Sequence, residues 1–301
     1  MNRISVTAAS VAIFSLAACG TGDPLDDDSP EDRGSDELVI GSQQYHSNTA
    51  IAEIYAQVLE HEGYQIDRQY EIGQREVYVP ELEAGEIDIF PEYTGNLLEY
   101  FASDHEVNEP DSVHAALSEA LPEGLEVLDY AEATDQDSYV VTGEFAQEHG
   151  LSEVGDLADV DEDLQIASHA EFETRPYGIE GLQEVYGVEL TLVPVEDSGG
   201  PLTLGALLDG DVEVANIYSA DPSIEEHDLV VLEDPEMLVP PQNLVPVVSD
   251  RVDEQAQDAL EDVGSRIDQD VLLEINDYSQ TSQESPAEVA QWWLDQQDML
   301  N

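Results

Sequence analysis

Short apolar runs alternate with segments of helical periodicity along most of this chain, and this alternation limits its fold more than any other feature. Residues 38–40 form a buried-strand candidate, and the apolar side chains of residues 51–59 then repeat at i, i+3, i+4, i+7 and i+8, which is one face of a helix. Gly63 is placed to end that helix. Alternating strands and helices predict an α/β fold built on parallel sheet.

The same alternation continues towards the C-terminus. Expected strands cover residues 65–72, 87–90, 125–128, 139–141, 164–167, 190–195, 212–218, 229–232 and 244–248, and expected helices cover 80–84, 113–121, 178–186 and 202–208. Ser285, Pro286 and Glu288 predict a capping box that starts a C-terminal helix. The chain has 301 residues, and single cores stop growing beyond about 250 residues, so two lobes are expected.

The charge of the chain excludes several classes of function. It carries 70 acidic residues against 7 basic ones, all of them Arg, for a net charge of −63, while hydrophobic residues still make up 41%. Binding to nucleic acid, or to an anionic membrane through a basic patch, would require many Lys and Arg side chains. This chain has too few of them. Carboxylates spread along the chain favour a protein that works in high salt, where their repulsion is screened. An acidic secreted protein from an ordinary habitat is the alternative.

The N-terminus resembles a bacterial lipoprotein signal. Residues 1–18 combine Arg3 with an apolar run, and Leu16-Ala17-Ala18-Cys19-Gly20 resembles the lipobox, in which the Cys is lipidated. Cys19 is the only cysteine of the chain, which excludes an intramolecular disulfide. The resemblance implies an extracytoplasmic protein anchored by lipid at Cys19 to the outer face of the cell membrane. A plain secretory signal is the alternative.

Residues 19–37 are rich in acidic side chains and contain two prolines, which predicts a disordered tether. Asp26, Asp27 and Asp28 lack the alternate spacing of an EF-hand loop, so a calcium site is not expected there. The seven His residues show no metal-ligand spacing either.

Four loops at the carboxyl ends of expected strands contain tyrosines, and ligands of α/β sheets bind at such ends. These loops carry Gln43-Gln44-Tyr45, Glu92 to Asn96, Arg175-Pro176-Tyr177 and Tyr218-Ser219. Aromatic faces attract quaternary ammonium groups, and an Arg fork suits a carboxylate. Tyr and Arg together therefore favour a zwitterion such as a betaine.

Several stretches resemble the substrate-binding lipoproteins of ABC importers for glycine betaine, choline and related osmoprotectants. They are Ile40-Gly41-Ser42-Gln43, Gly85-Glu86-Ile87-Asp88 running into Pro91-Glu92-Tyr93-Thr94-Gly95, Asp137-Ser138-Tyr139, Thr174-Arg175-Pro176 and Leu232-Glu233-Asp234. The resemblance covers nearly all of residues 38–297. It implies a solute-binding protein that is not an enzyme, needs no cofactor, and works with an ABC permease and its ATPase.

The resemblance also implies a two-lobed periplasmic-binding-protein fold of type II, with the ligand in the cleft between the lobes. Two hinge crossovers would fall near Tyr139 and near Pro240. One lobe would combine residues 38–138 with 243–301, and the other would be residues 139–242.

The ligand residues of the family can be carried over at matching positions. Tyr93, Tyr139 and Tyr218 match the tyrosines of an aromatic cage, and Arg175 resembles the Arg that binds the carboxylate. Three positions depart from the pattern: Gln242 stands where a further cage Tyr is often found, Gln43 where a Lys is, and Asn96 where a Thr is. These departures favour choline or another quaternary amine over glycine betaine.

Less specific roles remain open for these side chains. Tyr45 and Tyr177 are candidates to complete the cage, although Tyr177 is also expected as a simple rim residue. Tyr93 could be a core aromatic residue, and Arg175 could be a salt-bridge partner of one of the many acids. For the whole chain, a receptor for another solute such as an amino acid, or a ligand sensor without a permease, is the alternative.

The run Asp197-Ser198-Gly199-Gly200-Pro201-Leu202 resembles the nucleophile motif of chymotrypsin-like serine proteases. That chemistry requires a His base and a buried Asp upstream on antiparallel barrels. Here the run connects a strand to a helix in an α/β series, so Ser198 is expected to cap the helix. A serine hydrolase is therefore not expected.

Overall fold

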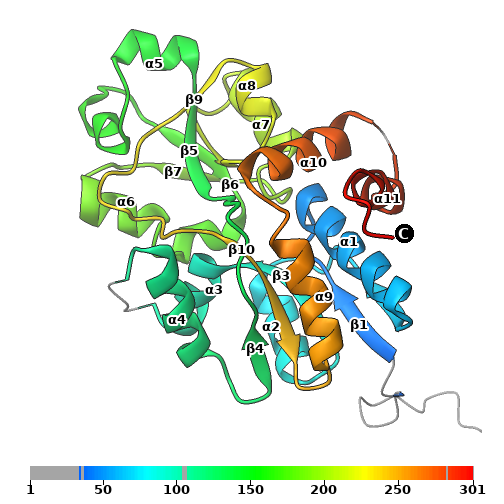
Figure 1. The fold of residues 1–301 in the computed structure, drawn as a ribbon. Helices are drawn as coiled ribbons and strands as arrows, with labels where there is room; N and C mark the ends of the chain where they lie inside the picture. The colour runs from blue at the N-terminus through cyan, green and yellow to red at the C-terminus, as the bar shows by residue number, and fades with distance from the viewer. Residues whose placement is uncertain (1–33, 35–36, 104–106, 283, 301) are drawn as a thin grey trace, which may run out of the picture. The chain divides into compact units, whose positions relative to one another are not determined.

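The computed structural model describes residues 34, 37–103, 107–282 and 284–300 (Figure 1). The signal sequence, Cys19 and almost all of the expected tether lie outside the described residues. Among the described helices, none is both long and apolar enough to span a bilayer.

One five-stranded sheet, with the order β2-β1-β3-β10-β4, forms the centre of the first lobe. Its strands are β1 (Glu37–Gly41), β2 (Gln65–Gln69), β3 (Ile89–Tyr93), β4 (Leu125–Val127) and β10 (Leu244–Ser249). The helices of this lobe are α1 (His46–Glu62), α2 (Arg75–Glu83), α3 (Thr94–Phe101), α4 (Pro110–Ala120), α9 (Glu254–Gly264), α10 (Gln269–Thr281) and α11 (Pro286–Gln296).

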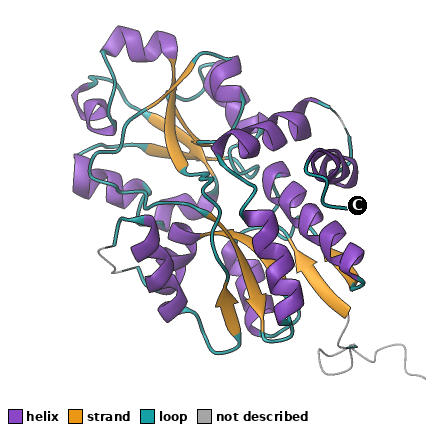
Figure 2. Ribbon diagram, viewed as in Figure 1, coloured by secondary structure: helices purple, strands orange, loops and turns teal. Residues whose placement is uncertain are grey.

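A second five-stranded sheet, with the order β7-β6-β8-β5-β9, forms the centre of the other lobe. Its strands are β5 (Asp137–Thr142), β6 (Gln165–Ser168), β7 (Thr191–Pro194), β8 (Val214–Tyr218) and β9 (Leu229–Val231). The helical segments are α5 (Gly143–His149), η2 (Val154–Asp159), η3 (Ala170–Thr174), α6 (Ile179–Tyr186), α7 (Pro201–Leu208) and α8 (Ser223–Glu226). Helices flank the strands of both sheets (Figure 2).

Both sheets are mixed, although the alternation of strands and helices predicted parallel sheet. β10 runs antiparallel to β3 and β4, and β5 runs antiparallel to β8 and β9. Each of these two strands directly follows a passage of the chain from one sheet to the other. A strand that enters a sheet from the other lobe does not need a helical crossover, so it can pair antiparallel.

The two passages between the sheets run side by side. They cover residues 128–136 and 232–243. The Asp135 amide donates to the Gln242 carbonyl at 3.1 Å, and the Leu244 amide donates to the Ala133 carbonyl, also at 3.1 Å. Paired extended segments of this kind can bend together, which is the geometry of a hinge.

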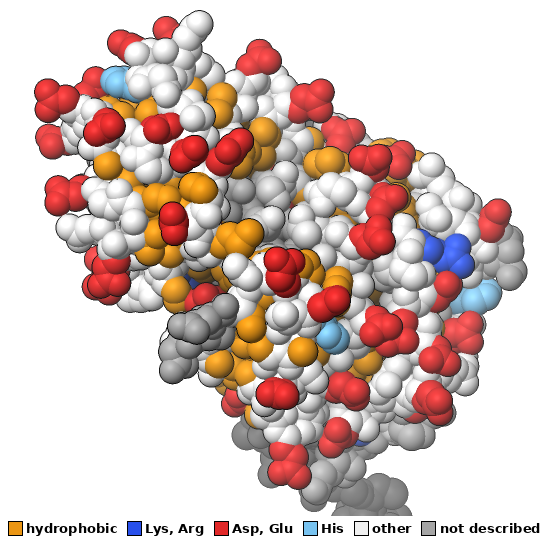
Figure 3. All heavy atoms as spheres, turned by 60° about the vertical axis from the view of Figure 1, so that its left-hand side comes forward, with side chains coloured by type: hydrophobic (Ala, Val, Ile, Leu, Met, Phe, Trp, Pro, Cys, Tyr) orange, Lys and Arg blue, Asp and Glu red, His pale blue; other side chains and the backbone are white. Residues whose placement is uncertain are grey.

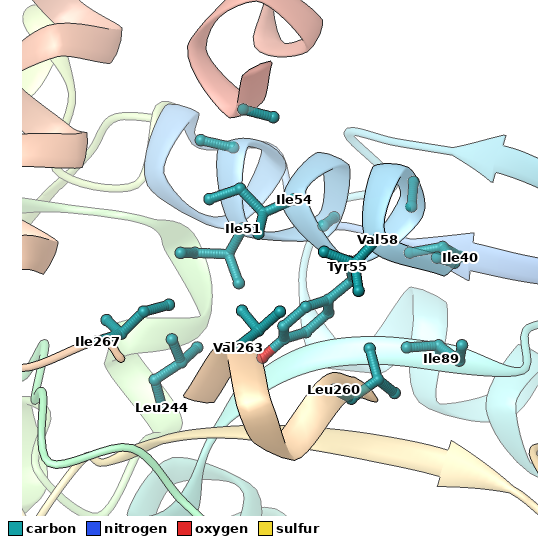
Figure 4. Packing of buried hydrophobic residues seen from close by; sticks show 14 of the residues in the cluster. Ile40, Ile51, Ile54, Tyr55, Val58, Ile89, Leu244, Leu260, Val263 and Ile267 are labelled. Carbon is teal, nitrogen blue, oxygen red and sulfur yellow. The ribbon is translucent and has the colours of Figure 1, made fainter. Parts of the chain in front are cut away.

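The core of the first lobe is built around α1. Ile51, Tyr55 and Leu260 are completely buried and belong to one apolar cluster. Figure 4 shows how side chains of α1 face β3, β10 and α9 in this cluster. The second lobe has its own core, which includes Phe172 and Leu182. Each lobe therefore has an apolar core of its own.

Several local signals in the sequence are confirmed. α1 ends at Gly63, which takes a left-handed φ of 104°, and Ser285 and Glu288 form the expected capping box of α11. The expected helix at residues 80–84 is wrong at its start, because α2 begins at Arg75 and contains Pro80 in its interior. A Pro removes one backbone hydrogen bond, and packing of α2 against the core outweighs that loss.

Acidic side chains are scattered over the visible face of the molecule (Figure 3), and basic side chains are few there. The acidic side chains do not gather in one patch on this face. The high-salt setting expected from the composition stays a prediction.

Packing around α1 gives a direct stability prediction. Leu260→Ala should lower the free energy of unfolding by about 2–5 kcal/mol, because it leaves a cavity in the core. Leu202, whose side chain is 70% exposed, is the matched control, and Leu202→Ala should change the free energy by no more than about 0.5 kcal/mol. Urea unfolding at fixed salt measures both. Equal losses in the two variants would contradict this packing.

Candidate functional site

A cavity of about 590 Å³ is lined by residues from both lobes. The first lobe contributes the segment before and at the start of α1, including Gln44 and Tyr45. The second lobe contributes Tyr218 at the end of β8 and the loop from Glu196 to Pro201. Part of the wall is acidic, with Asp135 from the first passage between the sheets.

Two tyrosine rings meet in this cavity from opposite lobes. The ring centroids of Tyr45 and Tyr218 are 5.1 Å apart, and the planes are tilted by 51°. Tyr93 ends β3 and is 3% exposed. Ser47 and Tyr45 approach its hydroxyl, but neither makes a hydrogen bond of normal geometry with it. Burial raises the pKa of all three hydroxyl groups, so these rings are neutral at physiological pH.

The carboxyl group of Asp135 in the cavity wall has a pKa well above its ordinary value. Burial is the main cause that raises the pKa of its carboxyl to about 7, with further contributions from Asp221 and Asp137. The Ala220 amide donates to its Oδ1 at 2.8 Å and partly offsets this effect. A carboxyl group with this pKa can gain or lose its charge near neutral pH.

Ser198 joins the two lobes and is not a helix cap, contrary to expectation. Its Oγ lies 3.0 Å from Nε2 of Gln74 and 3.4 Å from Nε2 of Gln44, both in the first lobe. The Asp197 carboxylate instead accepts from the Leu202 and Thr203 amides. A positive φ of 51° turns Ser198 away from the start of α7, and this leaves the cap to the longer Asp side chain.

Arg175 lines a second cavity of about 490 Å³, together with Asn96 and Tyr177. Its guanidinium group faces Glu76 of α2 in a bidentate arrangement, with Nη1 2.9 Å from Oε1 and Nη2 3.1 Å from Oε2. The side chain of Arg175 is 12% exposed, and that of Glu76 is 45% exposed. This ion pair connects the two lobes.

A buried ion pair in the first lobe was not foreseen from the sequence. Arg75 Nε and Nη2 donate to the two carboxylate oxygens of Glu92 at 2.8 and 2.7 Å, and the Tyr78 hydroxyl also donates to Glu92. The Glu92 side chain is 0% exposed. The signal that could have revealed it is the scarcity of basic residues, because each Arg of so acidic a chain has many acidic side chains available as partners.

Asn96 and Gln242 bond mainly to each other. The backbone amide of Asn96 donates to Gln242 Oε1 at 2.8 Å, and the side-chain Nε2 of Gln242 donates to Asn96 Oδ1 at 2.6 Å. Asn96 Nδ2 donates across to Asp137 Oδ2, also at 2.6 Å. These bonds tie the start of α3 to the second passage and to β5, which places both side chains beside the hinge.

The remaining predicted residues lie deeper. Tyr139 is 2% exposed in the second core, and its hydroxyl donates to the Tyr177 carbonyl at 2.6 Å. Tyr177 is also 2% exposed, so it is not a rim residue. Gln43 is 3% exposed, and its amide donates to Asn48 Oδ1. Tyr45 and Tyr218 therefore line the first cavity together, while Tyr93, Tyr139 and Gln43 are not among its lining residues.

The raised pKa of Asp135 gives a prediction for stability. Between pH 3.8 and about 7 the folded protein holds a proton that the unfolded chain releases. The stability contribution of Asp135 therefore falls as pH rises through this interval. Asp135→Asn keeps the acceptor for Ala220, so its stability advantage over the wild type should grow with pH, by up to about 4 kcal/mol, and level off above pH 7. Unfolding at a series of pH values measures this, and a pH-independent difference would contradict it.

Comparison with known proteins agrees with this architecture. Residues 36–296 match the family model of the substrate-binding domain of ABC-type glycine betaine transport systems. The glycine-betaine-binding protein of Pseudomonas aeruginosa is 25% identical over 280 residues, which cover 89% of this chain and 90% of that protein. The glycine betaine-binding protein YehZ of Escherichia coli is 25% identical over 233 residues, which cover 71% and 74%.

Among solved structures, one titled as a glycine betaine/carnitine/choline ABC transporter has a TM-score of 0.70. It shares 22% identity, and the match covers 88% of this chain and all of that chain. This likeness shows a shared two-lobed fold. Since the family model spans most of the sequence, the chain belongs to the family of non-enzymatic substrate-binding domains of ABC-type glycine betaine transport systems.

Proposed function

We propose that this protein captures a quaternary ammonium osmoprotectant between its two lobes and delivers it to an ABC permease with its ATPase. The observation that carries the proposal is the pair of rings from opposite lobes, Tyr45 and Tyr218, whose centroids are 5.1 Å apart beside an acidic cavity wall. In this proposal Cys19 carries the lipid anchor, so that the binding domain works outside the cytoplasm.

The chemistry of the cavity suits a bulky cation. A quaternary ammonium group cannot donate an ordinary hydrogen bond, so neutral aromatic faces are its best partners. Tyr45 and Tyr218 supply two such faces, and buried Tyr93 stands within electrostatic range of Tyr45 as a third. Asp135 adds negative potential at the wall once it is ionised. The cage that we propose therefore contains Tyr45 in place of Tyr139.

Capture would depend on closure of the two lobes. Contacts across the lobes include Ser198 with Gln74 and Arg175 with Glu76. A ligand held by Tyr45 of one lobe and Tyr218 of the other gains its full contacts only when the lobes are closed, so it shifts the hinge equilibrium towards the closed form. A permease could then recognise the closed form by its shape and distinguish it from the open form.

The relatives support the class of ligand. Two curated relatives are named as glycine betaine-binding proteins, and a related carnitine transport binding protein of Listeria monocytogenes is 22% identical over 222 residues. All three names refer to solutes with a quaternary ammonium group. The shared chemistry is thus the ammonium end, which the tyrosines would recognise.

Removal of one ring should weaken binding of a quaternary amine. Tyr218→Ala should raise the Kd by up to roughly 30-fold, the equivalent of about 2 kcal/mol for a desolvated cation–π contact. Tyr218→Phe keeps the ring and should stay within about threefold of the wild type. Calorimetry with choline and with glycine betaine, in molar salt, measures both variants.

Tyr64→Ala is the matched control, because Tyr64 lies after α1 and does not line the cavity. It should leave the affinity unchanged. If Tyr218→Ala and Tyr45→Ala both bind as tightly as the wild type, the aromatic cage is refuted. If the wild type binds no quaternary amine, the proposed solute class is refuted.

A further inference from the structure

The loop after β8 belongs to the second lobe in sequence, but it is held by the first lobe. It covers residues 219–222, between Tyr218 at the end of β8 and the start of α8. Ala220 of this loop is completely buried, and it packs in the apolar cluster of the first lobe. Tyr45 packs against the same cluster. The loop therefore joins the end of β8 that carries Tyr218 to the surroundings of Tyr45.

The backbone of Ala220 is hydrogen-bonded on both sides by side chains from outside the second lobe. Its amide donates to Oδ1 of Asp135 at 2.8 Å, and Nδ2 of Asn276 on α10 donates to its carbonyl, also at 2.8 Å. Gln280, one turn further along α10, donates through Nε2 to Oδ2 of Asp221 at 2.9 Å. Helix α10 of the first lobe thus reaches the second lobe at this loop (Figure 1).

The same cavity connects α10 with the two aromatic rings. Asn276 and Gln280 are lining residues of the cavity of about 590 Å³. Tyr45 and Tyr218 line it as well. Ala220 follows Tyr218 by two residues, so the Cα atoms of these two residues are at most about 7 Å apart. A shift of the loop would therefore change the cavity wall that contains Tyr218.

Packing of the core does not by itself account for an amide at position 276. Asn276 is 3% exposed, and its neighbours Leu272 and Ile275 on α10 are completely buried. Its Oδ1 is buried and has no hydrogen-bond partner in the described part of the chain. An unpaired acceptor in the interior is unfavourable, and an apolar side chain would avoid that cost. What the amide provides in return is the bond from Nδ2 to the Ala220 carbonyl.

We propose that Asn276 is a positioning residue for ligand binding: its bond to the Ala220 carbonyl holds the loop after β8 against the first lobe, and this keeps the Tyr218 ring opposite Tyr45. The inference rests on the proposed function and adds to it the element that sets the distance between the two rings. In this proposal Asn276 does not touch the ligand. It acts through Tyr218, because attraction between a cation and a ring depends on where the ring lies.

Asn276→Leu tests the proposal because it removes the amide, including the unpaired Oδ1, and keeps a side chain of similar size. Calorimetry at one fixed molar salt concentration measures the Kd of choline and of tetramethylammonium, which has only the ammonium end. Both Kd values should rise by about tenfold, the equivalent of one lost hydrogen bond. In a Tyr218→Ala background, Asn276→Leu should change the Kd of choline by less than about threefold, since the ring that it positions is gone.

Asn243→Leu is the matched control. Asn243 is 4% exposed, its Nδ2 donates to the Ala131 carbonyl at 3.0 Å, and its Oδ1 also lacks a hydrogen-bond partner among the described residues. It does not line the cavity. Asn243→Leu therefore removes the same kind of buried bond and should leave both Kd values unchanged.

A second variant covers the case in which Asn276→Leu does not fold. Gln280 is exposed, so Gln280→Ala should fold normally. It removes the other bond between α10 and the loop. The Kd of choline should rise by about two- to threefold, and this rise should disappear in the Tyr218→Ala background. An unchanged Kd in Gln280→Ala would then count against the proposal.

The outcomes separate the positioning role from the proposed function. An unchanged Kd in Asn276→Leu, the same loss with and without Tyr218, or an equal loss in Asn243→Leu would overturn the positioning role alone. A loss for choline but not for tetramethylammonium would also overturn it, because Asn276 would then bind the choline hydroxyl directly. If the wild type binds neither ligand, the proposed function fails and this inference fails with it.

Discussion

The buried pair of Arg75 and Glu92 is the interaction on which the geometry of the binding region depends. It joins the start of α2 to the end of β3, and both side chains are almost inaccessible to solvent. Removing one partner of such a pair leaves an uncompensated charge in the interior, which typically costs about 3–5 kcal/mol. Glu76 follows Arg75 in the chain, and Tyr93 follows Glu92 and donates its amide to that carboxylate at 2.7 Å. One ion pair thus fixes both the residue that faces Arg175 and the inner aromatic ring.

This arrangement separates two tasks that a zwitterion receptor would combine. In the proposed function, the aromatic rings of Tyr45, Tyr93 and Tyr218 would address the ammonium end of a ligand. The arginines, which could address a carboxylate end, are used by Glu76 and Glu92 to hold the protein together. A chain with 70 acidic and only 7 basic residues has few cations to spare. All five Arg side chains in the described part of the chain pair with acidic residues.

Much of the fold could be predicted from sequence because its signals are local. Helical periodicity and Gly63 define α1, and Ser285 with Glu288 defines the start of α11. The mixed sheets could not be predicted in the same way, since the direction of β5 and β10 depends on where the chain changes lobes. The start of α2 was missed because the helix was expected to begin at Pro80, whereas Pro80 lies in its interior and tertiary packing outweighs the lost hydrogen bond.

Local signals also suggested part of the candidate site, although the role of its residues in binding stays a prediction. Strand ends identified Tyr93 and Tyr218, since the carboxyl ends of strands can be located from apolar runs. Tyr139 matched a family pattern, but its hydroxyl bonds to the Tyr177 carbonyl inside the second core. The contact of Glu76 with Arg175 joins residues 99 positions apart on different lobes. No periodicity or motif encodes such a pairing, so only the three-dimensional arrangement reveals it.

A crystal structure of the protein grown with choline tests the central claim most directly. The account predicts the quaternary ammonium group within about 6 Å of the ring centroids of Tyr45 and Tyr218, between the two lobes, with the bidentate contact of Glu76 and Arg175 intact. Choline bound away from these rings would contradict the account.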